Sequence, residues 1–423
     1  MEKDKRFRSN FIWNIIGTTF SAFNSLFFMI VVTRVNGLDT AGIFTLAFST
    51  ACILYMIGIY AGRIYQVTEV DKSISNKDYI VNRVISCIML VVFAILFVTY
   101  RKYDAYKSLI FLSLSIYKAL EAFSEVLYGI MQKNEQLDKV GKSTFLKAIL
   151  SLIGFVVIDL ITKNVLIASI SISISYILII CIYDIKNVKE LIQKDESINV
   201  KSVFSIFKSG FFTFAISFLG LYMTNAPKYT IDSVLSEELQ AIFGIIIMPA
   251  TVMGLLAQFL IHPYLNQITE LNKNNNFKEL KKILYKIILI ILVLGAICSV
   301  AGYLLGTPIL GLLYNVDLHN YSIQLLQILI GATFYTMAGI ISPILIAMRC
   351  TKSQFVVYLS ISIIEYGICN LLVPVLELQG ATLAYLITMI LYFVTFYILS
   401  LTIIQKRSKI VNEGAKEWTL FIH

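Results

Sequence analysis

Three charged side chains fall well inside one long apolar stretch of the sequence, residues 106–131, which also has Lys107 at its start. Lys118, Glu121 and Glu125 recur at intervals of three and four residues, so a helix would place all three on one face. An ionisable group near the centre of a bilayer costs about 2.5–3.5 kcal/mol on insertion scales, and it usually faces a bundle interior or a water-filled cavity. Two interpretations stay open: a self-neutralising Lys118–Glu121 pair at a helix contact, or a stripe that lines a cavity. Glu125 favours the second, because its own helix offers it no further cation.

A lone carboxylate, Glu365, falls near the middle of another apolar stretch, residues 353–376. It could bind a proton or Na⁺ that drives transport, or it could pair with Lys118 across the bundle. We therefore treat Glu365 as a candidate residue for ion coupling.

These charges stand out because the chain around them is apolar. Of the 423 residues, 58% are apolar and 14% are charged, whereas a soluble domain has about 25% charged residues. This composition excludes a soluble globular protein, a disordered chain, a coiled coil and a disulfide scaffold. A membrane-spanning helix needs about 20 mostly apolar residues, and the sequence offers twelve such stretches. They are 9–33, 41–62, 80–100, 106–131, 144–162, 164–183, 203–226, 239–264, 284–306, 320–348, 353–376 and 380–404.

The predicted fold is an all-α polytopic membrane protein with about twelve transmembrane helices in two six-helix lobes. We expect the lobes to comprise residues 1–202 and 203–404, followed by a cytoplasmic basic tail, 405–423. Cations in this tail would be attracted to anionic membrane lipids by about 1 kcal/mol each.

The net charge of +9 could indicate a nucleic-acid partner, but the placement of the charges decides against it. Alternating the predicted spans puts 28 Lys and Arg on the inner side and six on the outer side, and it leaves Lys118 as the one mid-span cation among 35. Positive residues favour the cytoplasmic side of a membrane protein. The bias predicts a multi-pass protein of the cell membrane with both termini in the cytoplasm.

The sequence lacks the residue spacings that are typical of common catalytic sites. The six cysteines form no C-x-x-C pair, and the three histidines have no metal-ligand spacing. Gly141-Lys142-Ser143 matches the end of a phosphate-binding loop, but Gln136 stands where its first glycine belongs. We expect no ATP hydrolysis, no metal, no cofactor and no enzymatic activity.

Further polar residues lie within or at the ends of predicted spans. Asn14 and Asn225 fall within the first and seventh spans, and Arg63 marks the inner end of the second. Arg34 and Lys228 lie at the outer ends of spans that are six helices apart, as in two halves of one orientation. Each cation either contacts substrate or extends to the headgroups. We predict substrate contacts for Arg34, Arg63, Lys118, Glu121, Glu125, Lys228, Asn14 and Asn225.

The pattern resembles the bacterial polysaccharide flippases of the multidrug/oligosaccharidyl-lipid/polysaccharide superfamily. The residues that carry this resemblance are Asn14-x-x-Gly17, Arg34-x-x-Gly37 before Ala41-Gly42-Ile43-Phe44, and Asn225-Ala226-Pro227-Lys228-Tyr229 with Ile231-Asp232, Glu238 and Phe243-Gly244. The resemblance implies two six-helix bundles that face a cavity open to either side of the membrane in turn. It also implies a substrate made of oligosaccharide on a polyprenyl pyrophosphate.

The leading hypothesis is therefore a flippase that moves lipid-linked oligosaccharides from the inner to the outer leaflet by alternating access, with possible H⁺ or Na⁺ coupling. The acidic residues that accompany Lys118 favour a neutral or zwitterionic glycan over a strongly anionic one. The alternatives are a cation-coupled multidrug exporter of the same superfamily and a membrane glycan polymerase. Short outer loops argue against the polymerase.

Overall fold

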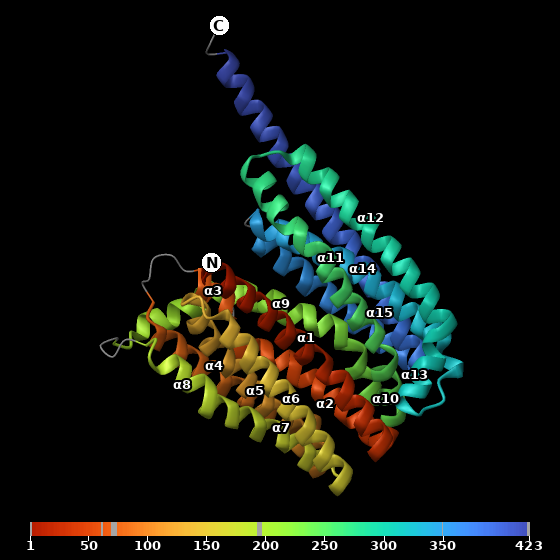
Figure 1. Cartoon of the computed structure of the whole chain (residues 1–423). Helices are drawn as coiled ribbons and strands as arrows, with labels where there is room; N and C mark the ends of the chain where they lie inside the picture. Colours follow the sequence, from red (N-terminus) through yellow and green to blue (C-terminus); the bar gives the residue numbers. More distant parts are fainter. Residues whose placement is uncertain (1, 61, 69–73, 193–196, 349, 421–423) are drawn as a thin grey trace. The chain divides into compact units, whose positions relative to one another are not determined.

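The computed structural model describes residues 2–60, 62–68, 74–192, 197–348 and 350–420, and within these ranges it contains helices and no strand. The first ten elements are α1 (Glu2–Asn36), α2 (Leu38–Ile59), α3 (Gly62–Thr68), α4 (Asn76–Arg101), α5 (Ala105–Lys133), α6 (Leu137–Thr162), α7 (Val165–Ile179), the π-helix η1 (Ile180–Asp184), α8 (Ile185–Lys189) and α9 (Val200–Val234). The remaining elements are α10 (Glu237–Ile246), α11 (Met248–Lys273), α12 (Phe277–Ala301), the π-helix η2 (Gly302–Gly306), α13 (Thr307–Tyr314), the 3₁₀-helix η3 (His319–Tyr321), α14 (Ser322–Ala347) and α15 (Thr351–Leu420) (Figure 1).

Every one of the twelve predicted spans coincides with helix in the described residues. Among the residues that the structure describes, ten helical segments are long and apolar enough to cross a membrane. Helix α5 has 29 residues but is less apolar because it carries the charged stripe. Helix α15 is two spans in succession, because Glu377 has non-helical dihedral angles (φ 50°, ψ −130°) shortly after Pro374. The predicted all-α polytopic membrane fold is thus confirmed.

The chain divides into two compact units. The first contains Met1–Leu221 with Ser236–Ala241, and the second contains Tyr222–Leu235 with Ile242–His423. In the first unit α1 packs against α6, while α5 packs against α2, α4 and α7. In the second unit α14 packs against α11, α12 and α15. The predicted division into residues 1–202, 203–404 and 405–423 stays a prediction, and residues 421–423 of the tail lie outside the described part.

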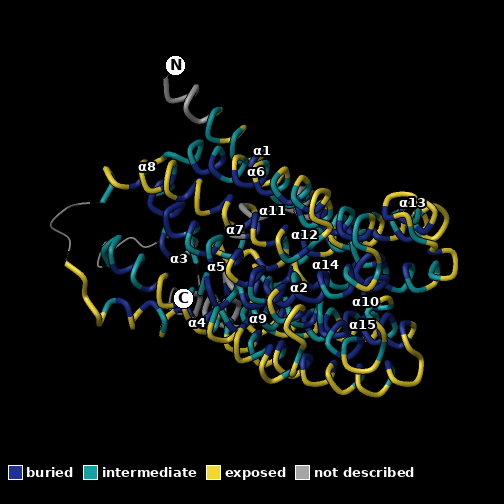
Figure 2. The backbone as a smooth tube through the Cα atoms, turned by 90° about the horizontal axis from the view of Figure 1, so that it is seen from below, coloured by how far each residue is buried: buried dark blue, intermediate teal, exposed yellow. Residues whose placement is uncertain are grey.

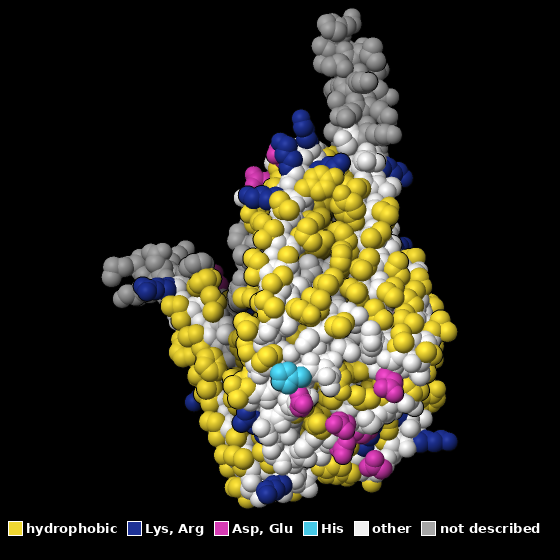
Figure 3. Space-filling model, turned by 90° about the vertical axis from the view of Figure 1, so that its right-hand side faces the viewer, with side chains coloured by type: hydrophobic (Ala, Val, Ile, Leu, Met, Phe, Trp, Pro, Cys, Tyr) yellow, Lys and Arg dark blue, Asp and Glu magenta, His cyan; other side chains and the backbone are white. Residues whose placement is uncertain are grey.

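Apolar side chains cover the outer faces of the helices. On α4, Ile88, Val92, Ile95 and Leu96 are 47–59% exposed and recur at helical spacing, so they form one continuous face. Exposed positions follow the helices of both units (Figure 2). On the face shown in Figure 3, hydrophobic side chains form a broad band and charged side chains gather toward its ends. Such a surface is suited to hydrocarbon and would be a liability in water.

Capping side chains mark where α4 and α5 of the first unit begin. Ser75 and Asp78 form a capping box at the start of α4, and the Asp104 side chain accepts a hydrogen bond from the Lys107 backbone at the start of α5. These caps satisfy backbone N–H groups that have no partner within the helix. Asp78 also accepts a hydrogen bond from the backbone N–H of Asn199, 2.7 Å away, which fastens the chain entering α9 to α4.

A close contact between α1 and α6 gives the first stability prediction. A Cβ atom added at Gly141 would collide with the backbone of Trp13 and Asn14, whereas one added at Gly154 of the same helix would meet Ser171 Oγ at 3.5 Å. We expect Gly141→Ala to destabilise the protein by about 1–3 kcal/mol, because α1 and α6 must separate. Gly154→Ala, the matched control, should be neutral or stabilising by up to about 1 kcal/mol. Thermal unfolding of the purified protein compares the two, and equal melting temperatures would contradict the packing argument.

Candidate functional site

The charged stripe of α5 begins with an ion pair inside the helix. Lys118 Nζ lies 2.6 Å from Glu121 Oε2 and 3.4 Å from the hydroxyl of Tyr117. The same ammonium lies 4.7–5.5 Å from the ring centroids of Phe48, Tyr55 and Tyr117, so aromatic faces surround it. Lys118 is only 8% exposed. The self-neutralising pair of Lys118 and Glu121 is therefore present.

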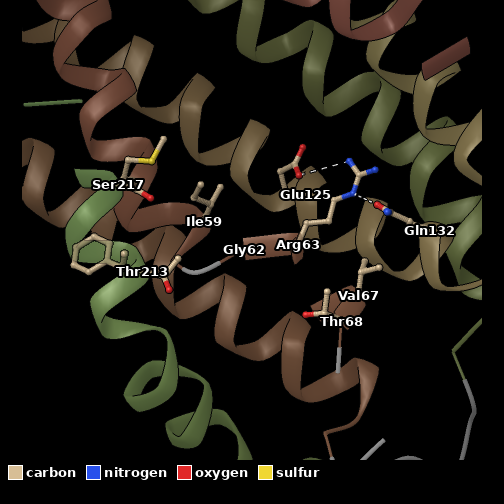
Figure 4. Close-up of a pocket in the computed structure, with 11 residues that line it drawn as sticks. Ile59, Gly62, Arg63, Val67, Thr68, Glu125, Gln132, Thr213 and Ser217 are labelled. Atoms are coloured by element: carbon tan, nitrogen blue, oxygen red, sulfur yellow. Dashed lines mark hydrogen bonds and ion pairs between the residues drawn. The ribbon is translucent and has the colours of Figure 1, made fainter. Parts of the chain in front are cut away.

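Glu125, which lacks a cation on its own helix, has one supplied by α3. Arg63 Nη1 lies 3.8 Å from Glu125 Oε2, and Arg63 Nε donates a hydrogen bond to Gln132 Oε1 at 2.6 Å (Figure 4). The guanidinium also lies 5.8 Å from the ring centroid of Tyr128. The side chains of Arg63 and Glu125 are 21% and 25% exposed, so this pair is accessible as well as formed.

The position of Arg63 is set by an interruption of the helical conformation between α2 and α3. Tyr60 (φ 26°) and Gly62 (φ 59°) both adopt positive φ. Arg83 of α4 is buried and donates from Nη1 to the carbonyl of Gly58 at 2.7 Å. A cation at the C-terminus of a helix stabilises its unpaired carbonyl groups. Arg83 thus holds the end of α2 from which the chain turns toward Arg63.

Two cavities in the first unit meet at the Arg63–Glu125 pair, because both residues line both cavities. The polar cavity has a volume of about 360 Å³. It is lined by Asn14, Thr18, Ser21, Ala22, Arg63, Glu121, Ser124, Glu125, Tyr128, Val140, Thr144, Lys147 and Tyr176. The second, which we call the α9 cavity, has a volume of about 520 Å³. It is lined by Met56, Ile59, Gly62, Arg63, Val67, Thr68, Glu125, Gln132, Thr213, Phe214 and Ser217 (Figure 4).

The cavities show how the two interpretations of the α5 stripe combine. Glu121 and Glu125 line the polar cavity, whereas Lys118 is not among its lining residues. The stripe is therefore an internal ion pair at its first turn and a cavity wall from Glu121 onward. Volumes of about 300–1,000 Å³ with a few convergent polar groups are typical of ligand sites.

A second ion pair at the polar cavity was missed by the sequence analysis. Lys147 of α6 lies 2.5 Å from Asp184 Oδ2, and their side chains are 1% and 0% exposed. Lys147 Nζ also donates to Ser124 Oγ at 2.7 Å and to the hydroxyl of Tyr128 at 2.9 Å. An ammonium has three N–H donors, so all three are satisfied. Lys147, one of the 28 cations predicted on the inner side, lies within α6 and is buried.

A signal for this pair was available in the sequence. Lys147 falls inside the predicted span 144–162, and Asp184 directly follows the predicted span 164–183. Asp184 is the last residue of the π-helix η1, Ile180–Asp184, which follows α7. Single π-turns inside helices are rare and are often found at functional sites, but their position cannot be inferred from hydropathy.

The other predicted site residues lie at several places. Asn14 lines the polar cavity, and Arg34 is exposed in the last turn of α1. In the second unit Lys228 is 5% exposed, and Asn225 donates to Thr224 Oγ1 at 3.1 Å. Arg34, Lys228 and Asn225 are not among the described residues that line either cavity, and their roles in substrate binding remain predictions.

Glu365 is fully buried in the second unit. It is 0% exposed, and neither carboxylate oxygen has a hydrogen-bond partner among the described residues. A charged carboxylate without partners is costly to bury, so such a group is neutralised by a proton or by a bound cation. Within the described part of the chain, no cluster of three or more His, Cys, Asp or Glu could hold a metal ion.

The chain is similar to proteins of known role along most of its length. It is 24% identical over 398 residues to the capsular polysaccharide biosynthesis protein CapF of Staphylococcus aureus, which covers 92% of this chain and 98% of that protein. No protein-family model matches the chain.

Two solved structures have the same fold at low sequence identity. An inward-facing multidrug resistance MATE family transporter of the MOP superfamily superimposes with a TM-score of 0.74 at 10% identity, covering 94% of this chain and 99% of that one. The lipid II flippase MurJ in an inward closed conformation gives a TM-score of 0.70 at 16% identity, with 97% and 92% covered.

The fold therefore defines a class: a multi-pass membrane protein with the fold of these MATE and MurJ structures. The similarity to a capsular polysaccharide biosynthesis protein over 92% of this chain, together with the MATE- and MurJ-like fold, bears out the predicted resemblance to the polysaccharide flippases of the multidrug/oligosaccharidyl-lipid/polysaccharide superfamily.

Proposed function

We propose that the protein is a flippase that moves oligosaccharide repeat units linked to polyprenyl pyrophosphate from the inner to the outer leaflet of the bacterial cytoplasmic membrane by alternating access. The observation that carries this proposal is the polar cavity inside a bundle of membrane-spanning helices. A sugar headgroup cannot cross about 30 Å of hydrocarbon without such an environment. The excess of Lys and Arg on one side supports an orientation with both termini in the cytoplasm.

The chemistry of the polar cavity suits a sugar with a phosphate nearby. Hydroxyl groups of Thr18, Ser21 and Thr144 offer donors and acceptors, and the rings of Tyr128 and Tyr176 offer flat apolar faces. Both cations that line the polar cavity have an acidic partner, Arg63 with Glu125 and Lys147 with Asp184, and Lys118 next to the cavity wall pairs with Glu121. This balance supports a neutral or zwitterionic glycan whose single strongly anionic part is the phosphate.

The proposal predicts where the substrate accumulates when the gene is inactivated. Lipid-linked oligosaccharide should build up on the inner leaflet, because its synthesis continues while its transfer stops. The measurement is the accessibility of the labelled sugar to a glycosidase added outside spheroplasts. Build-up on the outer leaflet instead would place the protein after the transfer step and refute the proposal.

A second candidate function, a cation-coupled multidrug exporter, is favoured by the isolated burial of Glu365 and by the MATE-like fold. The two candidates differ in cargo, whereas ion coupling through Glu365 is compatible with either. Drug sensitivity that falls when the protein is overproduced would favour the exporter.

We expect Glu365→Gln to separate ion coupling from folding. Glutamine keeps the size of the side chain and removes the titrating group, so transport should lose its dependence on a proton or Na⁺ gradient while the melting temperature changes little. Glu279→Gln is the matched control, because Glu279 pairs with Lys282 on an exposed face of α12. Transport by proteoliposomes under imposed gradients measures the effect. An unchanged gradient dependence in Glu365→Gln would rule out the coupling role.

A further inference from the structure

We infer that the two cavities of the first unit receive the two parts of one amphiphilic ligand. The α9 cavity takes the hydrocarbon chain next to the phosphate, the polar cavity takes the first sugar, and Arg63 binds the phosphate where the cavities meet. The inference rests on the proposed function. It further states which part of the substrate lies on each side of Arg63.

The α9 cavity has the more apolar lining and the polar cavity has more hydroxyl groups, as a ligand with a hydrocarbon part and a sugar part requires. Met56, Ile59, Val67 and Phe214 give the α9 cavity a largely apolar wall. In the polar cavity, hydroxyl-bearing side chains predominate; they are Thr18, Ser21, Ser124, Tyr128, Thr144 and Tyr176. Apolar surface gains about 25 cal/mol per Å² when it leaves water, whereas a sugar hydroxyl needs a hydrogen-bond partner. Each part of the ligand is therefore matched by one cavity.

Arg63 is the described cation at this place that can most easily exchange its partner. Its contact with Glu125 is 3.8 Å, compared with 2.6 Å for Lys118–Glu121 and 2.5 Å for Lys147–Asp184. A guanidinium also binds phosphate oxygens with two parallel N–H groups, which an ammonium cannot do. A phosphate entering between the cavities would displace Glu125 from Arg63, while Lys147 keeps its three acceptors.

An aromatic cluster fastens α9 to the break that follows α2, and this cluster forms one end of the α9 cavity. The ring of Tyr60 stacks on Phe214 with a centroid distance of 4.6 Å and an angle of 17°, and it meets the edge of Phe207 at 4.9 Å. Phe214 itself lines the cavity. The apolar wall is thus held next to Arg63 by contacts within the first unit.

The test compares two soluble probes on the full-length protein in nanodiscs: geranyl diphosphate, which has a short hydrocarbon chain, and inorganic pyrophosphate, which has none. We expect Ser217→Trp, which fills the α9 cavity, to weaken geranyl diphosphate binding at least tenfold and to change pyrophosphate binding less than threefold. Ser21→Trp, which fills the polar cavity, should leave both affinities within threefold and abolish transport of the lipid-linked oligosaccharide. Ser209→Trp, at an exposed position of α9, is the matched control.

The outcomes separate this inference from the proposed function. If Ser217→Trp weakens both probes equally, or if Ser21→Trp is the variant that weakens geranyl diphosphate, the assignment of the cavities is wrong although the protein can still be a flippase. If the wild-type protein neither binds the probes nor transports the oligosaccharide, the proposed function fails and the inference fails with it. Should Ser217→Trp lower the melting temperature, Ser217→Met fills the same space with a smaller side chain and is measured in its place.

Discussion

Replacing Lys147 with methionine is expected to destabilise the protein by about 3–5 kcal/mol, the largest stability effect of any single substitution proposed here. Removing one member of a buried ion pair leaves the other without compensation. Asp184, at 0% exposure, would be left with no cation, and Tyr128 and Ser124 would each lose a hydrogen bond from the ammonium. Unfolding of the purified protein in mixed detergent micelles gives the free energy.

Two further variants show whether burial is the cause. Lys142→Met removes the Lys142–Asp138 pair on the same helix, whose side chains are 37% and 23% exposed, and it should cost less than about 0.5 kcal/mol. The double variant Lys147→Met/Asp184→Leu should be more stable than Lys147→Met alone, because no isolated charge remains. Equal losses of unfolding free energy for Lys147→Met and Lys142→Met would show that the buried pair contributes no more to stability than the exposed one.

Arg63→Ala is expected to lower the rate of oligosaccharide transfer by about ten- to hundredfold. A hydrogen bond to a charged group contributes about 1.5–3 kcal/mol, and about 1.4 kcal/mol corresponds to a factor of ten. Arg63→Lys should recover part of the rate, because it restores the charge without the two-pronged geometry. The measurement is transfer of lipid-linked oligosaccharide in proteoliposomes, read by a glycosidase added outside.

The control for Arg63 is a cation outside the cavities. Lys282, which is 63% exposed on α12, pairs with Glu279 at 2.6 Å, and Lys282→Ala should leave transfer within about twofold of the wild-type rate. Transfer by Arg63→Ala at the rate of Lys282→Ala would mean that the guanidinium has no part in moving the substrate.

The membrane fold could be predicted from the sequence because hydropathy and span length are local properties. In the described residues all twelve predicted spans coincide with helix, and of the three stripe residues Glu121 and Glu125 line the polar cavity whereas Lys118 does not. The sequence also indicated that Glu125 needed a cation from elsewhere. It could not supply the identity of that cation, because Arg63 reaches Glu125 only through the break at Tyr60 and Gly62.

At the rest of the site, the contacts join residues that are far apart in the sequence, and such pairs could not be predicted from the sequence. Lys147 and Asp184 are 37 positions apart and belong to different elements, and Asp184, in a π-helical turn, lies 2.5 Å from Lys147. In the sequence, Gln132 is likewise an ordinary polar residue at the end of a helix. Its role as acceptor for Arg63 is evident only from the structure. Residues whose roles depend on a turn of unusual geometry leave little trace in hydropathy.

The charged stripe of α5 has a consequence for biogenesis. This helix carries too many charges to count among the ten segments apolar enough to cross a membrane, and each charge near the bilayer centre opposes insertion by about 2.5–3.5 kcal/mol. Lys118 and Glu121 can neutralise each other within one turn as soon as the helix forms. Glu125 cannot, but Arg63 has already left the ribosome when α5 emerges. Arg63, the counter-ion of Glu125, is thus synthesised before α5. We expect α5 to insert stably into the bilayer only together with the segments synthesised before it.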